Sequence, residues 1–346
     1  MKLATPRWWY SRGPRVAPVS RALLTPVSWI WASVTARRIA RARPVDPGVP
    51  VICVGNLTLG GTGKTPIVRA LAARLAAQGR AVHLLSRGYG GRLAGPVRVD
   101  ADRMTGADVG DEPLMLARDF PVWVARDRAA GAQAAAAAGA QVVVMDDGHQ
   151  NPSVAKALSL VVVDGETRGD EWPFGDGRVF PAGPLREPLA VGLSRADAAV
   201  VLLPADLPQL DPELTALLAD KPVLVARLAP TAAPPSGPQL GFAGVGKPWK
   251  VERALRAAGC DLVDFAPLPD HAPLDDGLMR MLADQAEAHG AGLVTTEKDW
   301  VRLPPAWRER VTAWPVRARF ENEAALAQLL QSRLGPMRFA HLDGPT

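Results

Sequence analysis

From residue 51 onward, short apolar runs alternate with longer stretches that have helical spacing. The runs are continuous in Val, Leu and Ile and show no strict in-and-out alternation, which favours strands buried on both faces of a parallel sheet. The predicted strands are 51–54, 81–85, 122–125, 141–145, 158–163 and 198–203, and the clearest helices between them are 66–79 and 126–139. The expected fold class is therefore α/β, with a doubly wound, mostly parallel sheet.

A proline-rich stretch divides this pattern. Residues 229–238 read APTAAPPSGP, which contains four prolines and cannot form regular structure, so a linker is predicted there. Strand and helix patterns resume after it, with strands at 239–243, 261–265 and 292–296, helices near 250–258 and 275–289, and a final strand and helix. The expected division is a large domain over 46–228 and a smaller α/β lobe over 239–346.

The first 45 residues form a basic, aromatic leader. They contain nine of the 40 Lys and Arg residues and no acid, whereas the other 301 residues contain 31 basic and 35 acidic side chains. The leader's longest uncharged stretch, 22–36, is 15 residues long, shorter than the ~20 needed to cross a bilayer. Arginines flank it, and it contains two of the leader's four tryptophans, which favour the headgroup zone. We expect an interfacial helix on an anionic membrane; the alternative is a helix packed on the protein's own core.

The uneven charge also narrows the function classes. The net charge of +5 divides into +9 for the leader and −4 for the rest, so the folded body lacks the basic surface of a general nucleic-acid binder. A hydrophobic fraction of 48% argues against disorder. The two cysteines, Cys53 and Cys260, are far apart and favour neither a zinc site nor a disulfide framework. A reducing, cytoplasmic compartment fits best.

Residues 55–66, GNLTLGGTGKTP, lie between a predicted strand and a predicted helix, which is the context of a phosphate-binding loop. Glycines let backbone N–H groups point at phosphate oxygens, Lys64 can reach the β- and γ-phosphates, and the Thr65 hydroxyl can bind Mg²⁺. Thr58 stands where the pattern GxxxxGK[ST] has glycine. The candidate nucleotide-binding residues are Thr58, Gly60, Gly61, Thr62, Gly63, Lys64 and Thr65.

Two acids follow the predicted strand 141–145. Asp146 and Asp147 lie where a carboxylate contact to Mg²⁺ is expected beside such a loop, although a turn cap is an alternative. Neighbouring strand residues face opposite ways, so the sequence does not separate the two.

The nucleotide base is less well marked. A guanine-reading loop should read [NT]KxD, and the nearest string, TEKD at 296–299, has Glu297 in place of the lysine. Guanine specificity is thus unsupported, and a kinase competes with a GTPase as the general class.

Eight strings in order resemble the tetraacyldisaccharide 4′-kinase (LpxK) family of the lipid A pathway. They are VGNLTLGGTGKTP (54–66), SRGYGGR (86–92), GDEPLMLA (110–117), MDDGHQN (145–151), GRVFPAGPLREP (177–188), GFAGVGKP (241–248), PDH (269–271) and TTEKDWVRL (295–303). His149 stands where phenylalanine is usual in that family, so packing there is expected to differ. The resemblance implies ATP- and Mg²⁺-dependent phosphorylation of the 4′-hydroxyl of a tetraacylated glucosamine disaccharide 1-phosphate.

The resemblance also implies roles for individual residues. Asp111 would accept the proton of the acceptor hydroxyl with His271 as its partner, and Lys64 would act on the transferred phosphoryl group. Asp111 can equally be the N-cap of the helix that follows it. An anionic acceptor calls for arginines near the site. The candidate acceptor-binding residues are Arg87, Tyr89, Arg128, Arg186 and Glu187, and Glu187 can instead be the structural partner of an arginine.

The implied partners are a lipid disaccharide 1-phosphate and, through residues 1–45, an anionic membrane surface. No nucleic acid and no obligate protein partner is expected. The implied location is the cytoplasmic face of the inner membrane of a Gram-negative bacterium. We expect the two lobes to close around ATP, with the linker near 229–238 as part of the hinge.

Overall fold

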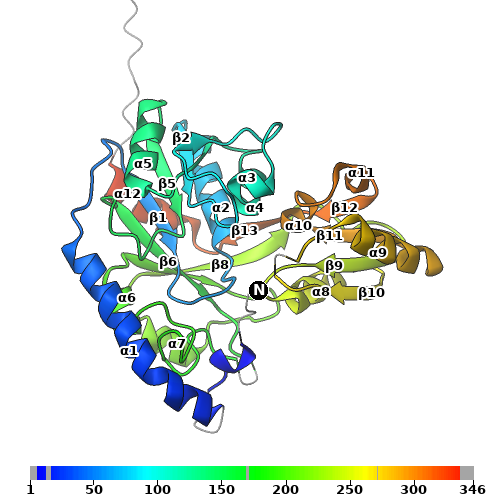
Figure 1. Ribbon diagram of the computed structural model, residues 1–346, viewed down its shortest axis with the longest axis horizontal. Coiled ribbons are helices and arrows are strands. Elements are labelled where there is room, and N and C mark those ends of the chain that lie inside the picture. The colour runs from blue at the N-terminus through cyan, green and yellow to red at the C-terminus, as the bar shows by residue number, and fades with distance from the viewer. Residues whose placement is uncertain (1–5, 13–16, 169–170, 271, 336–346) are drawn as a thin grey trace, which may run out of the picture.

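The computed structural model describes residues 6–12, 17–168, 171–270 and 272–335, and within them the chain forms a nine-stranded sheet and a four-stranded sheet (Figure 1). The large sheet has the order β13-β8-β7-β6-β1-β5-β2-β4-β3. Its strands are β1 (Val51–Gly55), β2 (Val82–Ser86), β3 (Val97–Arg98), β4 (Val122–Val124), β5 (Val142–Asp146), β6 (Leu158–Asp164), β7 (Ala198–Leu202), β8 (Val223–Pro230) and β13 (Val316–Phe320).

The small sheet has the order β10-β9-β11-β12, and all its strand pairs are parallel. Its strands are β9 (Gln239–Ala243), β10 (Leu262–Pro267), β11 (Gly292–Thr296) and β12 (Val311–Trp314). The helices of both units are η1 (Arg7–Trp9), α1 (Pro18–Arg41), α2 (Lys64–Ala77), α3 (Gly106–Val109), α4 (Asp111–Leu116), α5 (Arg128–Ala137), α6 (Leu189–Ser194), α7 (Pro212–Leu217), α8 (Pro248–Ala257), α9 (Asp276–Ala288), α10 (Glu297–Trp300), α11 (Pro305–Arg308) and α12 (Glu323–Leu334).

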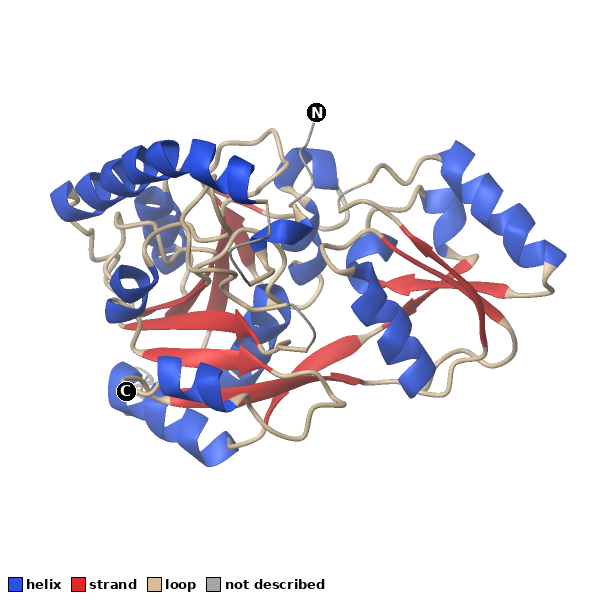
Figure 2. Cartoon of the chain, turned by 90° about the horizontal axis from the view of Figure 1, so that it is seen from below, coloured by secondary structure: helices blue, strands red, loops and turns tan. Residues whose placement is uncertain are grey.

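Helices cover both faces of the large sheet (Figure 2). One face packs against α2 and α12, with Leu71 and Leu326 in the same apolar cluster as Ile52 of β1. The other face packs against α5, where Ala132 lies in a cluster with Cys53. All five residues of β1 are buried, as expected of a central parallel strand with both faces covered. The predicted doubly wound α/β class is confirmed, and Cys53 is a buried core residue.

The predicted end of the first domain is wrong in one respect. β13 pairs antiparallel with β8, with Val316 opposite Pro230, and therefore belongs to the large sheet. α12 follows it and packs on the same core. The smaller unit thus comprises residues 239–314 rather than 239–346. The predicted linker is also shorter, because β8 continues through Pro230. The paired segments are 86 residues apart in the chain, and such a pairing leaves no local signal in the sequence. The hydrophobic pattern therefore predicts a strand here but not the sheet to which it belongs.

The leader helix α1 lies along the outside of the large unit (Figure 1). Its buried residues are polar, namely Arg21, Ser28 and Thr35, and its Trp31 ring packs edge-on against Phe180 with the centroids 4.9 Å apart. The Ser28 hydroxyl donates to the Val179 carbonyl at 2.8 Å and accepts from the Ala182 N–H at 3.1 Å. Among the residues that the structure describes, no helix is both long enough and apolar enough to span a membrane.

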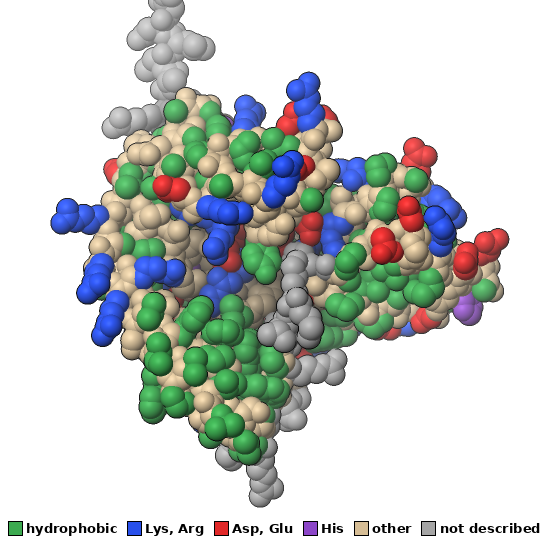
Figure 3. Space-filling model, viewed as in Figure 1, with side chains coloured by type: hydrophobic (Ala, Val, Ile, Leu, Met, Phe, Trp, Pro, Cys, Tyr) green, Lys and Arg blue, Asp and Glu red, His purple; other side chains and the backbone are tan. Residues whose placement is uncertain are grey.

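The apolar side chains of α1 face outward. They form an exposed stripe that we call the α1 apolar face, which includes Val19, Leu23, Val27, Ile30 and Val34. Figure 3 shows hydrophobic side chains gathered over this part of the molecule, with Lys and Arg side chains beside them. Of the two expectations for the leader, α1 does pack on the protein's own body, but the α1 apolar face lies outward.

Because β13 and α12 complete the large core, loss of the Leu326 side chain should destabilise the whole unit. Leu326 is 1% exposed, and we expect Leu326→Ala to lower the free energy of unfolding by about 2–5 kcal/mol through lost burial and a cavity. Urea unfolding followed by circular dichroism measures this. Gln328→Ala, on the exposed side of α12, is the matched control and should change stability by less than about 0.5 kcal/mol. Equal effects of the two changes would contradict the assignment of α12 to the core.

Candidate active site

The glycine-rich segment forms a loop between β1, which ends at Gly55, and α2, which begins at Lys64. Gly60 and Gly63 have φ values of 102° and 77°, a region that favours glycine. A side chain at position 63 would also overlap Leu202. The loop therefore has the predicted strand–loop–helix context, and the N-terminus of α2 is available to an anion.

The first half of this loop is braced by its neighbours. Thr58 forms an isolated bridge with Leu185, and its carbonyl accepts from Asn56 Nδ2 at 2.8 Å and from Arg186 Nε at 3.0 Å. Thr58 is 3% exposed. The residue that replaces the usual glycine thus lies in the wall of the loop. Thr62 lies at the tip, and its buried hydroxyl has no hydrogen-bond partner among the described residues.

Asp146 is the last residue of β5 and lies opposite Val54, so it ends beside the start of the loop. It is 3% exposed, and its Oδ1 atom has no hydrogen-bond partner among the described residues. The pKa of Asp146 is raised to about 7, mainly because the carboxylate is buried and secondly because the negative charge of Glu112 is nearby. A buried carboxylate oxygen without a partner, close to the N-terminus of α2, is a suitable ligand for Mg²⁺, and Thr65 lies in the first turn of that helix.

Asp147 has a different environment. Its Oδ1 lies 2.8 Å from Arg186 Nη1 and 3.6 Å from Lys64 Nζ. Partial desolvation alone would raise the pKa of Asp147, but the positive charges of Lys64 and Arg186 outweigh it and lower the pKa to about 2. Asp147 therefore holds Lys64 and Arg186 at the loop, which distinguishes it from Asp146.

The candidate acceptor-binding residues fall into two groups. Arg128 is 3% exposed, donates to the Ala125 carbonyl at 2.7 Å, and has a buried Nε with no partner among the described residues. Burial lowers the pKa of Arg128 to about 10. Arg186 is braced between Asp147 and the loop, as described above. Arg87 and Tyr89, by contrast, are exposed.

Glu187 is buried and fully engaged with its neighbours. Its two carboxylate oxygens each lie 2.6 Å from Arg195 Nη2, and Oε1 accepts from Gln150 Nε2 at 3.0 Å. Of the two roles considered for Glu187, this geometry supports the structural partner of an arginine.

Asp111 lies at the start of α4, directly after Gly110, whose φ is 92°. Gly110 occupies the N-cap position, so Asp111 is not the cap that the alternative interpretation required. Asp111 Oδ2 lies 3.3 Å from Arg302 Nε, and this ion pair crosses from the large unit to the small one. His271, its expected partner, lies outside the described residues.

The small unit also approaches the phosphate loop. A Cβ atom on Gly246 would lie 3.4 Å from the Gly61 backbone nitrogen, so the two glycine-rich loops meet. Close by, Asp164 at the end of β6 forms ion pairs with Lys247 at 3.0 Å and Lys250 at 2.7 Å. These lysines were not among the predicted site residues. Their only sequence signal is the string GFAGVGKP and the cationic start of the following helix.

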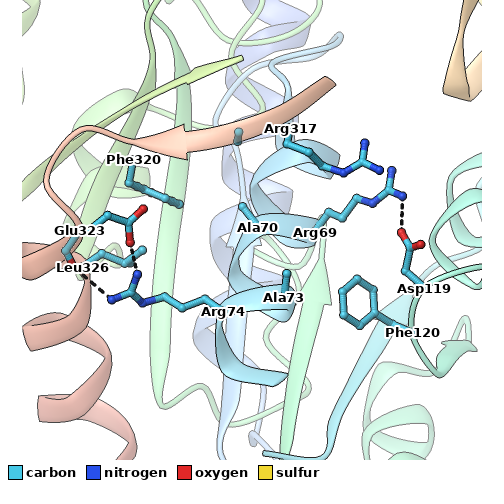
Figure 4. Close-up of a pocket in the computed structure, with 11 residues that line it drawn as sticks. Arg69, Ala70, Ala73, Arg74, Asp119, Phe120, Arg317, Phe320, Glu323 and Leu326 are labelled. Carbon is cyan, nitrogen blue, oxygen red and sulfur yellow. Dashed lines mark hydrogen bonds and ion pairs between the residues drawn. The ribbon is translucent and has the colours of Figure 1, made fainter. Parts of the chain in front are cut away.

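A separate cavity of about 370 Å³ lies between α2, β13 and α12 (Figure 4). Its arginines have acidic neighbours, Arg69 with Asp119 and Arg74 with Glu323. None of the candidate site residues lines it. It is therefore distinct from the phosphate site, although it shares α2 with that site.

His149 packs directly beneath the phosphate loop. A side chain at Gly55 would overlap it, and its ring lies 3.1 Å from Ser159 Oγ and 2.8 Å from the Gly192 carbonyl. Burial lowers the pKa of His149 from 6.5 to about 4. Packing at position 149 is expected to differ from that of the phenylalanine usual in the family. The structure shows the difference as two polar contacts of the His149 ring, which phenylalanine could not make.

The low pKa of His149 predicts a pH-dependent stability. The unfolded chain binds a proton near pH 6.5 and the folded chain only near pH 4, so this residue stabilises the fold above pH 6.5 and less as the pH falls toward 4. Asp146, with its raised pKa, has the opposite dependence. We therefore expect the free energy of unfolding to fall less between pH 7 and pH 5 in His149→Phe than in the unchanged chain. Urea titrations at both pH values measure this, and equal losses would contradict it.

Comparisons with known proteins identify the family of the chain. A family model described as tetraacyldisaccharide-1-P 4′-kinase matches residues 20–335. Proteins named tetraacyldisaccharide 4′-kinase include one from Phenylobacterium zucineum, 72% identical over 94% of this chain and 98% of that protein, and one from Caulobacter vibrioides, 70% identical over 96% and 99%.

The fold comparison gives the same family. The crystal structure of LpxK from Aquifex aeolicus in complex with ATP is similar with a TM-score of 0.71 and 25% identity, over 91% of this chain and 99% of that one. The resemblance carried by the eight strings is confirmed: the chain belongs to the tetraacyldisaccharide-1-P 4′-kinase family.

Proposed function

We propose that this chain transfers the γ-phosphoryl group of ATP to the 4′-hydroxyl of tetraacyldisaccharide 1-phosphate, which yields the 1,4′-bisphosphate precursor of lipid A. The observation that carries the proposal is the phosphate loop. It places Lys64 3.6 Å from Asp147, beside a buried Asp146 with an unpartnered oxygen. Kinase family membership and similarity to a structure that holds ATP support this assignment.

The nucleotide half of the site consists of the loop and the end of β5. Backbone N–H groups of residues 60–65 would bind the phosphates, and Lys64 would neutralise charge on the transferred group. Thr65 and Asp146 would hold Mg²⁺, which neutralises phosphate charge when bound. Asp147 keeps the Lys64 ammonium in place through an ion pair, and Arg186 in turn holds the Asp147 carboxylate.

The acceptor half requires a base and anion-binding groups. The O–H bond of the 4′-hydroxyl breaks as its oxygen attacks the γ-phosphorus, the proton passes to the Asp111 carboxylate, and the bond to the leaving ADP oxygen breaks. His271, next to Ala272, would be the partner of this base. Arg128 would use its unpartnered Nε toward the phosphorylated sugar, while Arg87 and Tyr89 would contact the acceptor from the exposed side.

Activity should depend strongly on one residue from each half. We expect Lys64→Ala and Asp111→Asn each to lower kcat by about 10²–10⁴-fold, because phosphoryl transfer depends on charge neutralisation and on the base. Transfer of ³²P from ATP to tetraacyldisaccharide 1-phosphate in detergent micelles measures this. Lys221→Ala and Asp220→Asn, on a surface turn after α7, are the matched controls. Absence of labelled lipid with folded, unchanged protein and Mg²⁺ would refute the proposed reaction.

We further propose that α1 holds the enzyme on an anionic membrane, at the cytoplasmic face of the inner membrane. The supporting observation is the orientation of the helix, which buries polar side chains and exposes the α1 apolar face. Arg37, Arg38 and Arg41 are exposed at its C-terminal end and suit anionic headgroups. The helix also touches the site, because Trp31 Nε1 donates to the Arg186 carbonyl at 3.0 Å.

Removal of the apolar face should weaken membrane binding and leave the fold intact. Leu23, Ile30 and Val34 are 58–73% exposed, and we expect their joint replacement by serine to lower vesicle partitioning at least about tenfold through lost apolar burial. Co-sedimentation with anionic vesicles measures this. Met281→Ser, at another exposed apolar site, is the control. Full co-sedimentation of the triple variant would show that α1 is not the anchor.

A further inference from the structure

The string TEKDWVR, which fails as a guanine-reading loop, is instead a contact between the two units. Glu297 accepts from Arg69 of α2 at 3.1 Å and from Arg317 of β13 at 2.6 Å. Lys298 lies 3.3 Å from Glu112, and Arg302 lies 3.3 Å from Asp111. Three residues within a six-residue stretch of the small unit thus reach the phosphate-loop helix, β13 and the segment that bears the candidate base.

Arg302 makes three contacts with three parts of the chain. Its Nε faces Asp111 Oδ2, its Nη1 lies 2.8 Å from Asp299 Oδ1, and its Nη2 donates to the Ala272 carbonyl. The side chain is 9% exposed. Because the guanidinium group is planar and rigid, these contacts fix Asp111 relative to the backbone at position 272, which directly follows His271.

Asp299 anchors the guanidinium group. It is 0% exposed, and its Oδ2 accepts from the Gly244 N–H at 3.0 Å and from the Thr296 hydroxyl at 2.8 Å. A Cβ atom on Gly244 would lie 3.1 Å from Asp299 Oδ1 and 3.3 Å from Arg302 Nη1. The loop of residues 244–246, which meets the phosphate loop at Gly61, therefore packs directly on this ion pair.

On the far side, the Asp111 carboxylate is confined by the large unit. A side chain at Gly106 would overlap Asp111 Oδ1, so one oxygen lies against the backbone of α3 while the other faces Arg302. The large unit thus confines one oxygen of this carboxylate, and the small unit contacts the other.

We propose that Arg302 is a positioning residue for the phosphoryl transfer: its guanidinium group holds the Asp111 carboxylate in the orientation that accepts the acceptor's proton, and it does so only when the small unit is docked. The inference rests on the proposed function. Arg302 and its anchor Asp299 belong to the small unit, whereas Asp111 belongs to the large unit. The orientation of the Asp111 carboxylate therefore depends on the contact between the two units.

A positioning role and a merely structural role predict different kinetics. If Arg302 acts through Asp111, its loss lowers kcat, leaves the KM for ATP within about twofold, and has little further effect once Asp111 is replaced. A structural role predicts the same fold-loss whether or not Asp111 is present, together with weaker ATP binding.

The test measures ³²P transfer to tetraacyldisaccharide 1-phosphate by the full chain carrying Arg302→Gln, Asp111→Asn or both. We expect Arg302→Gln to lower kcat about 10–100-fold, as displaced catalytic groups do, and to lower it less than about twofold in the Asp111→Asn background. Arg302→Lys, which cannot make the three contacts together, should recover only part of the rate. Equal losses in both backgrounds, or a raised KM for ATP with unchanged kcat, would overturn the proposal.

Two controls keep the result interpretable. Arg308→Gln changes an arginine that contacts the Val301 and Leu303 carbonyls in the same turn, and it should leave kcat within about twofold. If Arg302→Gln melts below the assay temperature, the pair Asp299→Asn/Arg302→Gln, which leaves no unpaired buried carboxylate, replaces it in the same cycle. Failure of the unchanged chain to phosphorylate the lipid would instead refute the proposed function.

Discussion

The arrangement of the site depends on two negative charges at the carboxyl end of a central strand of the large sheet. Asp146 and Asp147 are consecutive at the end of β5, and β5 lies beside the strand that leads into the phosphate loop. Lys64 and Arg186 compensate Asp147, whereas Asp146 remains buried with one oxygen unpartnered. Lys64 and Arg186 are both directed at Asp147, so the unpartnered oxygen of Asp146 is the carboxylate atom left for a divalent cation.

Charge pairing also joins the two units. Asp164 at the end of β6 binds Lys247 and Lys250, and on the other side of the phosphate loop Asp111 faces Arg302. Buried pairs of this kind contribute little net stability, because desolvation offsets their attraction, but a mismatched partner is strongly disfavoured. The pairs therefore specify one docked arrangement of the small unit rather than merely strengthening its attachment.

The sequence was most informative where the chemistry is local. Strand, loop and lysine are adjacent along the chain, so the phosphate loop and the acids after β5 could be predicted. The membership of β13 could not, because its pairing with β8 depends on a return of the chain after 86 residues. The burial of Arg21, Ser28 and Thr35 in α1 was equally hidden, since composition does not say which face of a helix the body covers. Arg302 lies within a recognised string, but only its contact with Asp111 gives it a role.

The pairing of Val316 with Pro230 has a further consequence. The small unit enters and leaves the large one through two neighbouring antiparallel strands, so it is an insertion at the tip of a β-hairpin. The two connections lie side by side, so the small unit is attached to the large one along a single line. Any rotation about that line would move the loop at Gly246 relative to the phosphate loop and Arg302 relative to Asp111 at the same time.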